Sequence, residues 1–411
     1  MSKINRPKFL DDIYRSDVKV GRFLSVLILF GVAFGLKRGI QDNYLADIIV
    51  FAPFERGIVE FFREMPGLLL MFILALMYKF ADSKIFKIGI ALMTAGSAGL
   101  MLTATGGMFM TKFFVVFFMV IFSTGEHIIM PVRSTIAMEL AKQEKAGISL
   151  GITTSINQLG NIAGFLLVTL VFFILGKFGL GRMDIIGFRI VFGLCTALLV
   201  FAALVAAALK ETKLKAPRQR FYSAKKFNKY YILEVFYGAR KQIFLTFAPY
   251  VLILHYGASP SVIAILYAVC AVFVMLLSPL IGRLIDKVGY KAVMVGDTII
   301  LFFVCLFYGY AHTLFPFHIA FIVVCINFVL DQVISIASMA NNIYARQISD
   351  NPEELTVTLS TGISVNHIFS ILIALIGGWI WQVAGIGVLF SISAGLALIN
   401  SLYAATIKVP K

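Results

Sequence analysis

Two short segments combine residue types that can bind an anion inside an apolar environment. They are Phe34-Gly35-Leu36-Lys37-Arg38-Gly39-Ile40 and Tyr237-Gly238-Ala239-Arg240-Lys241-Gln242-Ile243. Each places an aromatic residue and a glycine before two adjacent cations, at the corresponding place in its own half of the chain. A charge inside a long apolar segment costs about 2.5–3.5 kcal/mol or more, which indicates a functional use. The candidate ligands of an anionic solute are therefore Lys37, Arg38, Arg240 and Lys241. Helical neighbours point about 100° apart, so we expect one cation of each pair to face the solute.

A second charged group lies in the next apolar segment. Glu60, Arg63 and Glu64 have the spacing i, i+3, i+4 and therefore share one face of a helix. This set is equally consistent with an internal salt-bridge cluster and with a role in gating or ion coupling. Arg63 is also a candidate ligand of the solute.

Further ionisable residues lie near the middle of later apolar segments. Glu126 and His127 are the leading candidates for carrying protons, because a buried carboxyl group can take up a proton and histidine titrates near neutral pH. Asp331 is a further candidate for proton coupling or gating. The alternative is that Glu126 and Asp331 only neutralise the dibasic pairs. Three more polar residues are candidates for lining a cavity, or for interhelical hydrogen bonds in the case of the amides: Asn157, Asn366 and His367. Of these, His367 is also a candidate for proton coupling or gating.

The composition is that of a polytopic membrane protein. Apolar residues make up 60% of the 411 residues and charged residues only 14%, against about 25% in a soluble domain. The net charge of +15 comes from cations in the short segments between apolar runs, so it predicts membrane topology rather than nucleic-acid binding. The four cysteines lie in apolar runs and predict neither a disulfide nor a metal site. With no nucleotide-binding loop or nucleophile motif, we expect no enzyme and no cofactor.

Hydropathy predicts an all-α membrane protein with twelve transmembrane helices in two pseudo-symmetric bundles of six. The expected spans are 22–46, 54–79, 84–105, 111–138, 146–176, 185–209, 228–255, 259–284, 290–311, 317–345, 355–384 and 386–407. The expected domains are an N-terminal bundle over 1–209, a cytoplasmic linker over 210–227 and a C-terminal bundle over 228–411. The linker is rich in lysine and arginine, so it and both termini should face the cytoplasm.

The two halves repeat one another beyond the dibasic segments. Corresponding positions are Asp82 with Asp286, Glu126 with Asp331, and Ser155-Ile156-Asn157 with Ser364-Val365-Asn366. Repetition at half-length is typical of secondary transporters, whose binding site lies at the repeat interface near the midplane of the bilayer.

The segment Gly282-Arg283-Leu284-Ile285-Asp286-Lys287-Val288-Gly289-Tyr290-Lys291 resembles the cytoplasmic loop motif of the major facilitator superfamily, Gly-x-x-x-Asp-Arg/Lys-x-Gly-x-Arg/Lys. Its glycines should permit a tight turn, and Asp286 should accept hydrogen bonds from the start of the following helix. The first-half copy, around Asp82, has lost both glycines. The predicted conformational motif comprises Gly282, Asp286, Lys287, Gly289, Lys291 and Asp82.

The resemblance implies alternating access, by rocking of two bundles around a cavity lined by spans 1, 4, 7 and 10, with spans 2, 5, 8 and 11 beside it. The arrangement also resembles that of the organophosphate–phosphate antiporter branch, in which one basic residue from span 1 and one from span 7 bind phosphate. We therefore predict a monomeric, proton-coupled transporter of a small organic anion, in the bilayer of a bacterial inner membrane. The alternatives are a proton-driven exporter of amphiphilic drugs or lipids and a membrane-embedded sensor or scaffold, for which the loops show no signalling domain.

Overall fold

The computed structural model describes residues 12–14, 18–77, 79–103, 109–142, 145–181, 184–209 and 224–407. This part of the chain is almost entirely helical and contains one isolated β-bridge and no strand. Nine helical stretches within it are long and apolar enough to cross a membrane. The predicted all-α membrane class is confirmed, whereas the number of twelve spans stays a prediction. The count of nine takes 357–405 as one stretch and omits the more polar second and seventh predicted spans.

Over its described residues, the chain forms two compact units. Unit 1 comprises Met1–Tyr44 and Leu69–Ala216, and unit 2 comprises Leu45–Leu68 and Pro217–Lys411. The second predicted span is therefore divided between the units. Residues 210–223 of the predicted linker lie outside the described residues.

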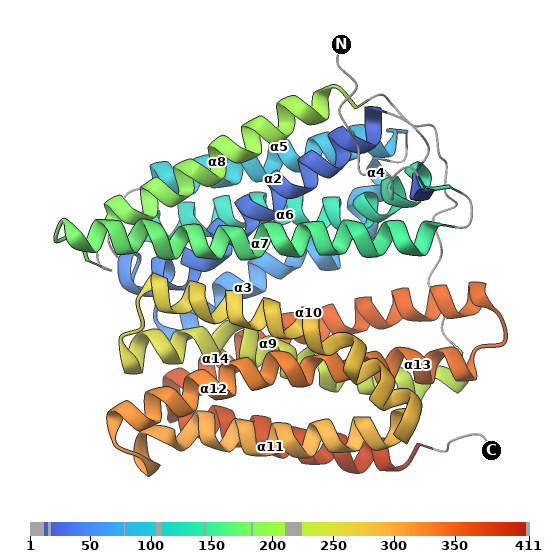
Figure 1. Cartoon of the computed structure of the whole chain (residues 1–411). Helices are drawn as coiled ribbons and strands as arrows, with labels where there is room; N and C mark the ends of the chain where they lie inside the picture. The colour runs from blue at the N-terminus through green and yellow to red at the C-terminus, as the bar shows by residue number, and fades with distance from the viewer. Residues whose placement is uncertain are drawn as a thin grey trace. The chain divides into compact units, whose positions relative to one another are not determined.

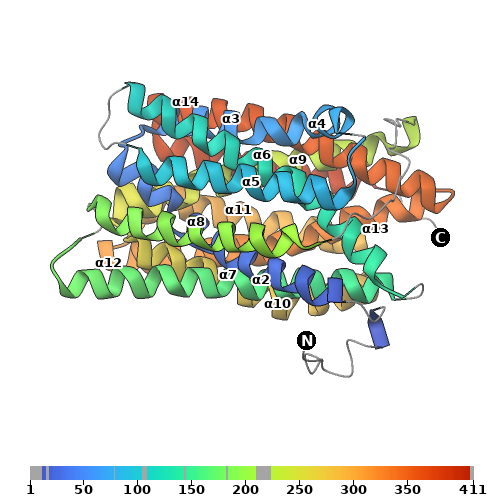
Figure 2. The ribbon, with the colours of Figure 1, turned by 90° about the horizontal axis from the view of Figure 1, so that it is seen from above.

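Unit 1 is a bundle of packed helices. Its helices are α2 (Val18–Asn43), α4 (Leu70–Leu76), α5 (Asp82–Leu102), α6 (Phe109–Leu140), α7 (Ala146–Lys177) and α8 (Ile185–Ala207). The first of them, α2, packs against α7 and α8, and α5 packs against α6 and α8. Figures 1 and 2 both show α5 and α8 side by side. Glycine permits a close approach of α2 and α7: a Cβ on Gly35 would collide with the backbone oxygen of Asn161 on α7.

Unit 2 contains the remaining helices. They are α3 (Pro53–Leu68), α9 (Asn228–Tyr256), α10 (Pro260–Val288), α11 (Tyr290–Leu314), α12 (Phe317–Ser335), α13 (Met339–Ile348) and α14 (Pro352–Ala405). Short π- and 3₁₀-helical turns cover Tyr44–Ile48, Lys225–Phe227 and Ile336–Ser338. The long helix α14 packs against α11, α9 and α3, and α12 packs against α10 and α11 (Figure 1).

Two breaks subdivide the helices where the sequence weakens them. Gly385 has a φ of 86° and bends α14, between the two predicted spans 355–384 and 386–407. The other break is at Leu69, which separates α3 from α4 and follows Pro66 and Gly67. Proline and glycine both disfavour a continuing helix, so α3 can belong to unit 2 while α4 belongs to unit 1.

In each unit, a cation near the start of one helix donates a hydrogen bond to a backbone oxygen at the C-terminal end of the last helix. In unit 1, Arg22 of α2 donates to the carbonyl oxygen of Ala208 at 2.9 Å, at the end of α8. In unit 2, Lys229 of α9 donates to the carbonyl oxygen of Thr406 at 2.9 Å, at the end of α14. Cations at these positions satisfy terminal carbonyl groups and favour the negative end of the helix dipole.

Candidate functional site

The first cation of each dibasic pair is buried within its own unit. Lys37 is only 3% exposed. Its ammonium group donates to the side-chain oxygen of Gln41, one helical turn further along α2, and lies 4.6 Å from the centre of the Phe122 ring. Both contacts hold the cation with neutral groups, one through an amide dipole and the other through a cation–π interaction.

Arg240 occupies the corresponding position in unit 2 and is 9% exposed. Its Nη2 donates to both the carboxylate Oδ1 and the backbone oxygen of Asp331 on α12, each at 3.0 Å. The other carboxylate oxygen, Oδ2, accepts a hydrogen bond from Gln332 at 3.3 Å. For this cation, the structure agrees with the alternative that an acid elsewhere in the bundle neutralises the pair.

The second cation of each pair is half-buried. Both Arg38 and Lys241 retain part of their surface, unlike their neighbours in the sequence. Lys241 lies close enough to Glu64 and Glu234 to interact electrostatically with both, and among the described residues it forms no ion pair with either. The helical offset between the two cations of a pair thus separates a buried one from a more accessible one.

The predicted charged face on α3 forms an ionic cluster with one further member. Glu60 is fully buried and accepts from Arg56 at 2.8 Å and from Nε of Arg63 at 3.0 Å. Arg63 also donates to Glu64. Gln242 of α9 adds a third donor to Glu60, at 3.1 Å. Carboxylates with this many donors stay paired in an apolar surrounding, which agrees with the salt-bridge alternative for Glu60 and Arg63.

Glu64 connects this cluster to α14. Its Oε2 lies 3.2 Å from Nδ1 of His367, and the carboxylate also interacts electrostatically with Lys241. A carboxylate and an imidazole at this distance can share a proton. The structure therefore brings together two predicted coupling residues and one predicted ligand in unit 2.

Asn366 contacts a carboxylate that the sequence interpretation left out of the site. Glu234 on α9 is buried and accepts from Asn341 at 3.2 Å and from Asn366 at 3.5 Å. The two residues Glu234 and Lys241 are seven positions apart, so they share one face of α9. The same face carries Gly238, whose carbonyl oxygen accepts from Ser370 at 3.2 Å.

Within unit 1, the predicted polar residues interact with neighbours on their own helix or on α2. Glu126 is half-buried and interacts electrostatically with Arg133 on the same helix. The ring Nδ1 of His127 lies 2.8 Å from the backbone oxygen of Ser123. Asn157 is half-buried on α7, where its backbone oxygen marks a close crossing with Gly31 of α2.

The loop motif behaves partly as expected. Gly289 ends α10 with a φ of 85°, a left-handed conformation that favours glycine, and α11 begins at the next residue. Gly282 instead lies inside α10 and makes no turn. Asp286 is exposed in the last turn of α10, and the predicted hydrogen bond to the start of α11 is not formed among the described residues. Three other motif residues are Lys287, at the end of α10, Lys291, in the first turn of α11, and Asp82, the first residue of α5.

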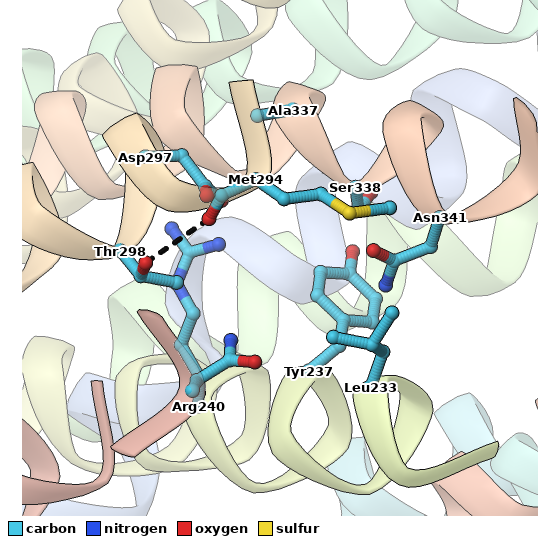
Figure 3. Close-up of a pocket in the computed structure, with 10 residues that line it drawn as sticks. Leu233, Tyr237, Arg240, Met294, Asp297, Thr298, Ala337, Ser338 and Asn341 are labelled. Atoms are coloured by element: carbon cyan, nitrogen blue, oxygen red, sulfur yellow. Dashed lines mark hydrogen bonds between the residues drawn. The ribbon is translucent and has the colours of Figure 1, made fainter. Parts of the chain in front are cut away.

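The sequence interpretation missed a polar cavity in unit 2. Figure 3 shows Arg240 extending from α9 towards Asp297 and Thr298 of α11, with Asn341 on the other side beside Tyr237. The signal that could have found Asp297 is its place as a lone carboxylate inside an apolar span, which is a reason to suspect function.

The sequence of the C-terminal part of this chain and the fold of the chain are both similar to those of known membrane transporters. Residues 230–411 match the family model of the Major Facilitator Superfamily. The fold is similar to that of a mutant of the nucleoside transporter NupG, with a TM-score of 0.76, 13% identity and coverage of 95% of this chain and 100% of that chain. It is also similar to a D-xylose-proton symporter, with a TM-score of 0.72, 13% identity and coverage of 95% and 97%.

A peptide transporter, POT, in complex with alafosfalin gives a TM-score of 0.69, 14% identity and coverage of 98% of this chain and 96% of that chain. No curated protein sequence matches the chain significantly. The helical fold is thus that of multi-pass membrane transporters. The C-terminal part of the chain, residues 230–411, is thus similar in sequence to the major facilitator superfamily, and the fold of the whole chain is similar to that of solved transporters.

Proposed function

We propose that the chain is a secondary active transporter that moves a small organic anion, a carboxylate or a phosphate ester, by alternating access coupled to protons. The observation that carries this proposal is the half-buried Lys241, which lies near Glu64 and Glu234 without an ion pair to either. A cation held at membrane depth in this way is available to a ligand, whereas the ion pair with Asp331 engages Arg240.

The proposed ligand cations are Lys241 and Arg38, the second residue of each dibasic pair. Pseudo-symmetry supports the choice, because Arg38 is half-buried at the corresponding place on α2. Arginine donates two parallel hydrogen bonds to a carboxylate or phosphate, and lysine adds a point charge. In this proposal Lys37 and Arg240 stabilise the local structure, and Asn157 and Asn366 lie beside the ligand.

The proposed proton carrier in unit 2 is the pair of Glu64 and His367. Their separation of 3.2 Å allows a proton on the imidazole to be stabilised by the carboxylate, and the nearby Lys241 links the charge of the pair to the occupancy of the site. Glu126 and His127 are the corresponding proposal for unit 1. One protein of similar fold is a D-xylose-proton symporter, and a mutant of the peptide transporter POT was crystallised with sulfate, an anion.

Three finer properties belong to the same proposal. The protein acts as a monomer, transports its solute without chemical conversion, and resides in a bacterial inner membrane with both termini in the cytoplasm. The cation-rich segment 210–229 supports this orientation through the positive-inside rule.

Ligand-induced thermal stabilisation tests the anion site. The purified protein would be screened with small carboxylates and phosphate esters, starting with succinate and glycerol 3-phosphate. We expect one class to raise the Tm of the wild type, and Arg38→Gln or Lys241→Gln to abolish the shift. Lys287→Gln, which changes an exposed cation, is the matched control. Stabilisation that survives both site substitutions would remove these residues as ligands.

A second candidate function is proton-driven export of amphiphilic drugs or lipids. The observation that favours it is that Arg56, Arg63 and Arg240 each pair with a carboxylate inside unit 2, which lowers the positive charge available to an anion. Stabilisation by amphiphilic cations, with no response to carboxylates or phosphate esters, would select this function over the first.

A further inference from the structure

A small polar cavity lies in unit 2, apart from the Glu64–His367 pair. It has a volume of about 20 Å³ and is lined by residues of α9, α11, α13 and α14 and the short helix between α12 and α13. A cavity of this size holds about one water molecule and is too small for an organic solute. Its polar lining residues are Tyr237, Arg240, Asp297, Thr298, Ser338, Asn341 and Asn400.

Three buried polar atoms of this lining have no hydrogen-bond partner. They are Oδ1 of Asp297, Nε of Arg240 and Oδ1 of Asn400. Buried polar atoms are nearly always hydrogen-bonded, so an unsatisfied group requires an explanation. The carboxylate oxygen is the most costly of the three if Asp297 is ionised, because an ionised group in an apolar bundle needs a compensating charge.

The charges around the cavity do not balance. Arg240 is the one cation that the described lining contributes, and it already pairs with Asp331 at 3.0 Å. Asp297 interacts with the same guanidinium electrostatically but lies beyond ion-pair distance. One guanidinium therefore faces two carboxyl groups. If both carboxyl groups are ionised, the three groups together carry a net negative charge, which one bound proton or other positive charge would cancel.

We propose that Asp297 and Asp331 share one proton, which resides on Asp297 while Arg240 pairs with Asp331. The proton comes from water and bonds to Oδ1 of Asp297. When Arg240 turns to Asp297, this proton leaves to water and another bonds to Asp331. A metal cation fits the site poorly, because the Arg240 guanidinium on one wall would repel it, whereas a proton converts the second carboxyl group to a neutral one.

The titratable and charged groups that face this pair come from three helices, α9, α10 and α11. Arg240 and Tyr237 come from α9, and Arg240 interacts with both carboxyl groups. Cys270 of α10 and Cys305 and Tyr308 of α11 interact with Asp331, which itself lies on α12. None of these neighbours adds a positive charge beyond Arg240, so the count of one cation to two acids holds within the described residues.

This inference rests on the proposed coupling to protons and adds a second proton site to it. Infrared difference spectroscopy of the purified protein tests it without transport. A protonated carboxyl group has a C=O stretching band that a carboxylate lacks, and exchange into D₂O shifts it. We expect the wild type to show such a band at neutral pH and Asp297→Asn to lose it, with Asp286→Asn, an exposed aspartate on α10, retaining it.

Asp331→Asn provides the second arm. With one carboxyl group removed, Arg240 can pair with Asp297, the cluster no longer needs a proton, and the band should again be lost. A wild type without the band, a band unchanged in Asp297→Asn, or a band unchanged in Asp331→Asn would each overturn the proposal. Failure of proton-coupled transport with the band present would count against the proposed function and leave the shared proton in place.

Discussion

The two units place the same pair of cations on matched helices and surround the first cation differently. In both, an aromatic-glycine step precedes a buried cation and a half-buried one. Unit 1 holds Lys37 with the amide of Gln41 and the ring of Phe122, whereas unit 2 holds Arg240 with the carboxylate of Asp331. The place of the two cations on the helix is thus common to both units, whereas the groups that contact the first cation differ between them.

The acids of the two units differ in the same way. In unit 2, Glu60 is fully buried and accepts from three donors on α3 and α9. In unit 1, Glu126 is half-buried and interacts electrostatically with Arg133. Unit 2 therefore concentrates the balanced charge, which makes it the place where removing a single charge should cost most.

The largest loss of unfolding free energy is expected for Glu60→Gln. Removing this carboxylate leaves the buried guanidinium groups of Arg56 and Arg63 short of their shared partner, which should cost about 3–5 kcal/mol of unfolding free energy. The matched change in unit 1, Glu126→Gln, should cost less, because Glu126 is only half-buried and interacts electrostatically with a single cation, Arg133. Thermal unfolding of both variants in detergent is the measurement. Equal losses would contradict the difference between the units.

An intermediate effect is expected where the repeats agree. Gly35 and Gly238 each lie where a Cβ would meet backbone of a crossing helix, that of Asn161 on α7 and that of Asn366 on α14, the latter at 2.7 Å. Gly35→Ala and Gly238→Ala should each destabilise by about 1–3 kcal/mol through overpacking, with the larger loss for Gly35, whose approach is closer. Denaturation curves of the two variants give the comparison. A neutral result at either glycine would show that the crossing can relax.

The smallest effect is expected from an exposed ionic contact in unit 2. Lys226 lies 2.7 Å from both Asp350 and Glu354, and their carboxylates raise the pKa of its ammonium group. Because the folded pKa is raised, this contribution is present below the ordinary lysine pKa of about 10.4 and is lost as pH rises through the folded pKa.

Lys226→Gln should therefore lower the Tm slightly at pH 8, and the difference from wild type should shrink at high pH and at high salt. Lys225→Gln, at the neighbouring exposed position, is the control. A difference that persists unchanged above the lysine pKa would mean that the Lys226 effect does not come from its charge.

Much of the helical architecture could be predicted from the sequence, because hydropathy and turn residues mark the ends of apolar helices. The expected span 146–176 corresponds to α7 (Ala146–Lys177), and the spacing of Glu60, Arg63 and Glu64 correctly placed them on one face. Local spacing is sufficient for these features.

The contacts between helices could not be predicted in this way. The approach of His367 to Glu64, and the amides of Asn341 and Asn366 on Glu234, join residues far apart in the chain. A single sequence does not specify how one helix is rotated against another. The same limit explains why Arg240 and Lys241 were equal candidates until the structure showed that one is buried beside Asp331.

Uptake into proteoliposomes tests the central claim most directly. The reconstituted protein would be given an imposed proton gradient and a radiolabelled anion that stabilises the wild type, with Lys241→Gln and the exposed-site control Lys287→Gln alongside. We predict uptake that depends on both the anion and the gradient. Uptake should fall at least about tenfold in Lys241→Gln, since a charge-assisted hydrogen bond contributes about 1.5–3 kcal/mol. Uptake that ignores the gradient and is unchanged in Lys241→Gln would contradict it.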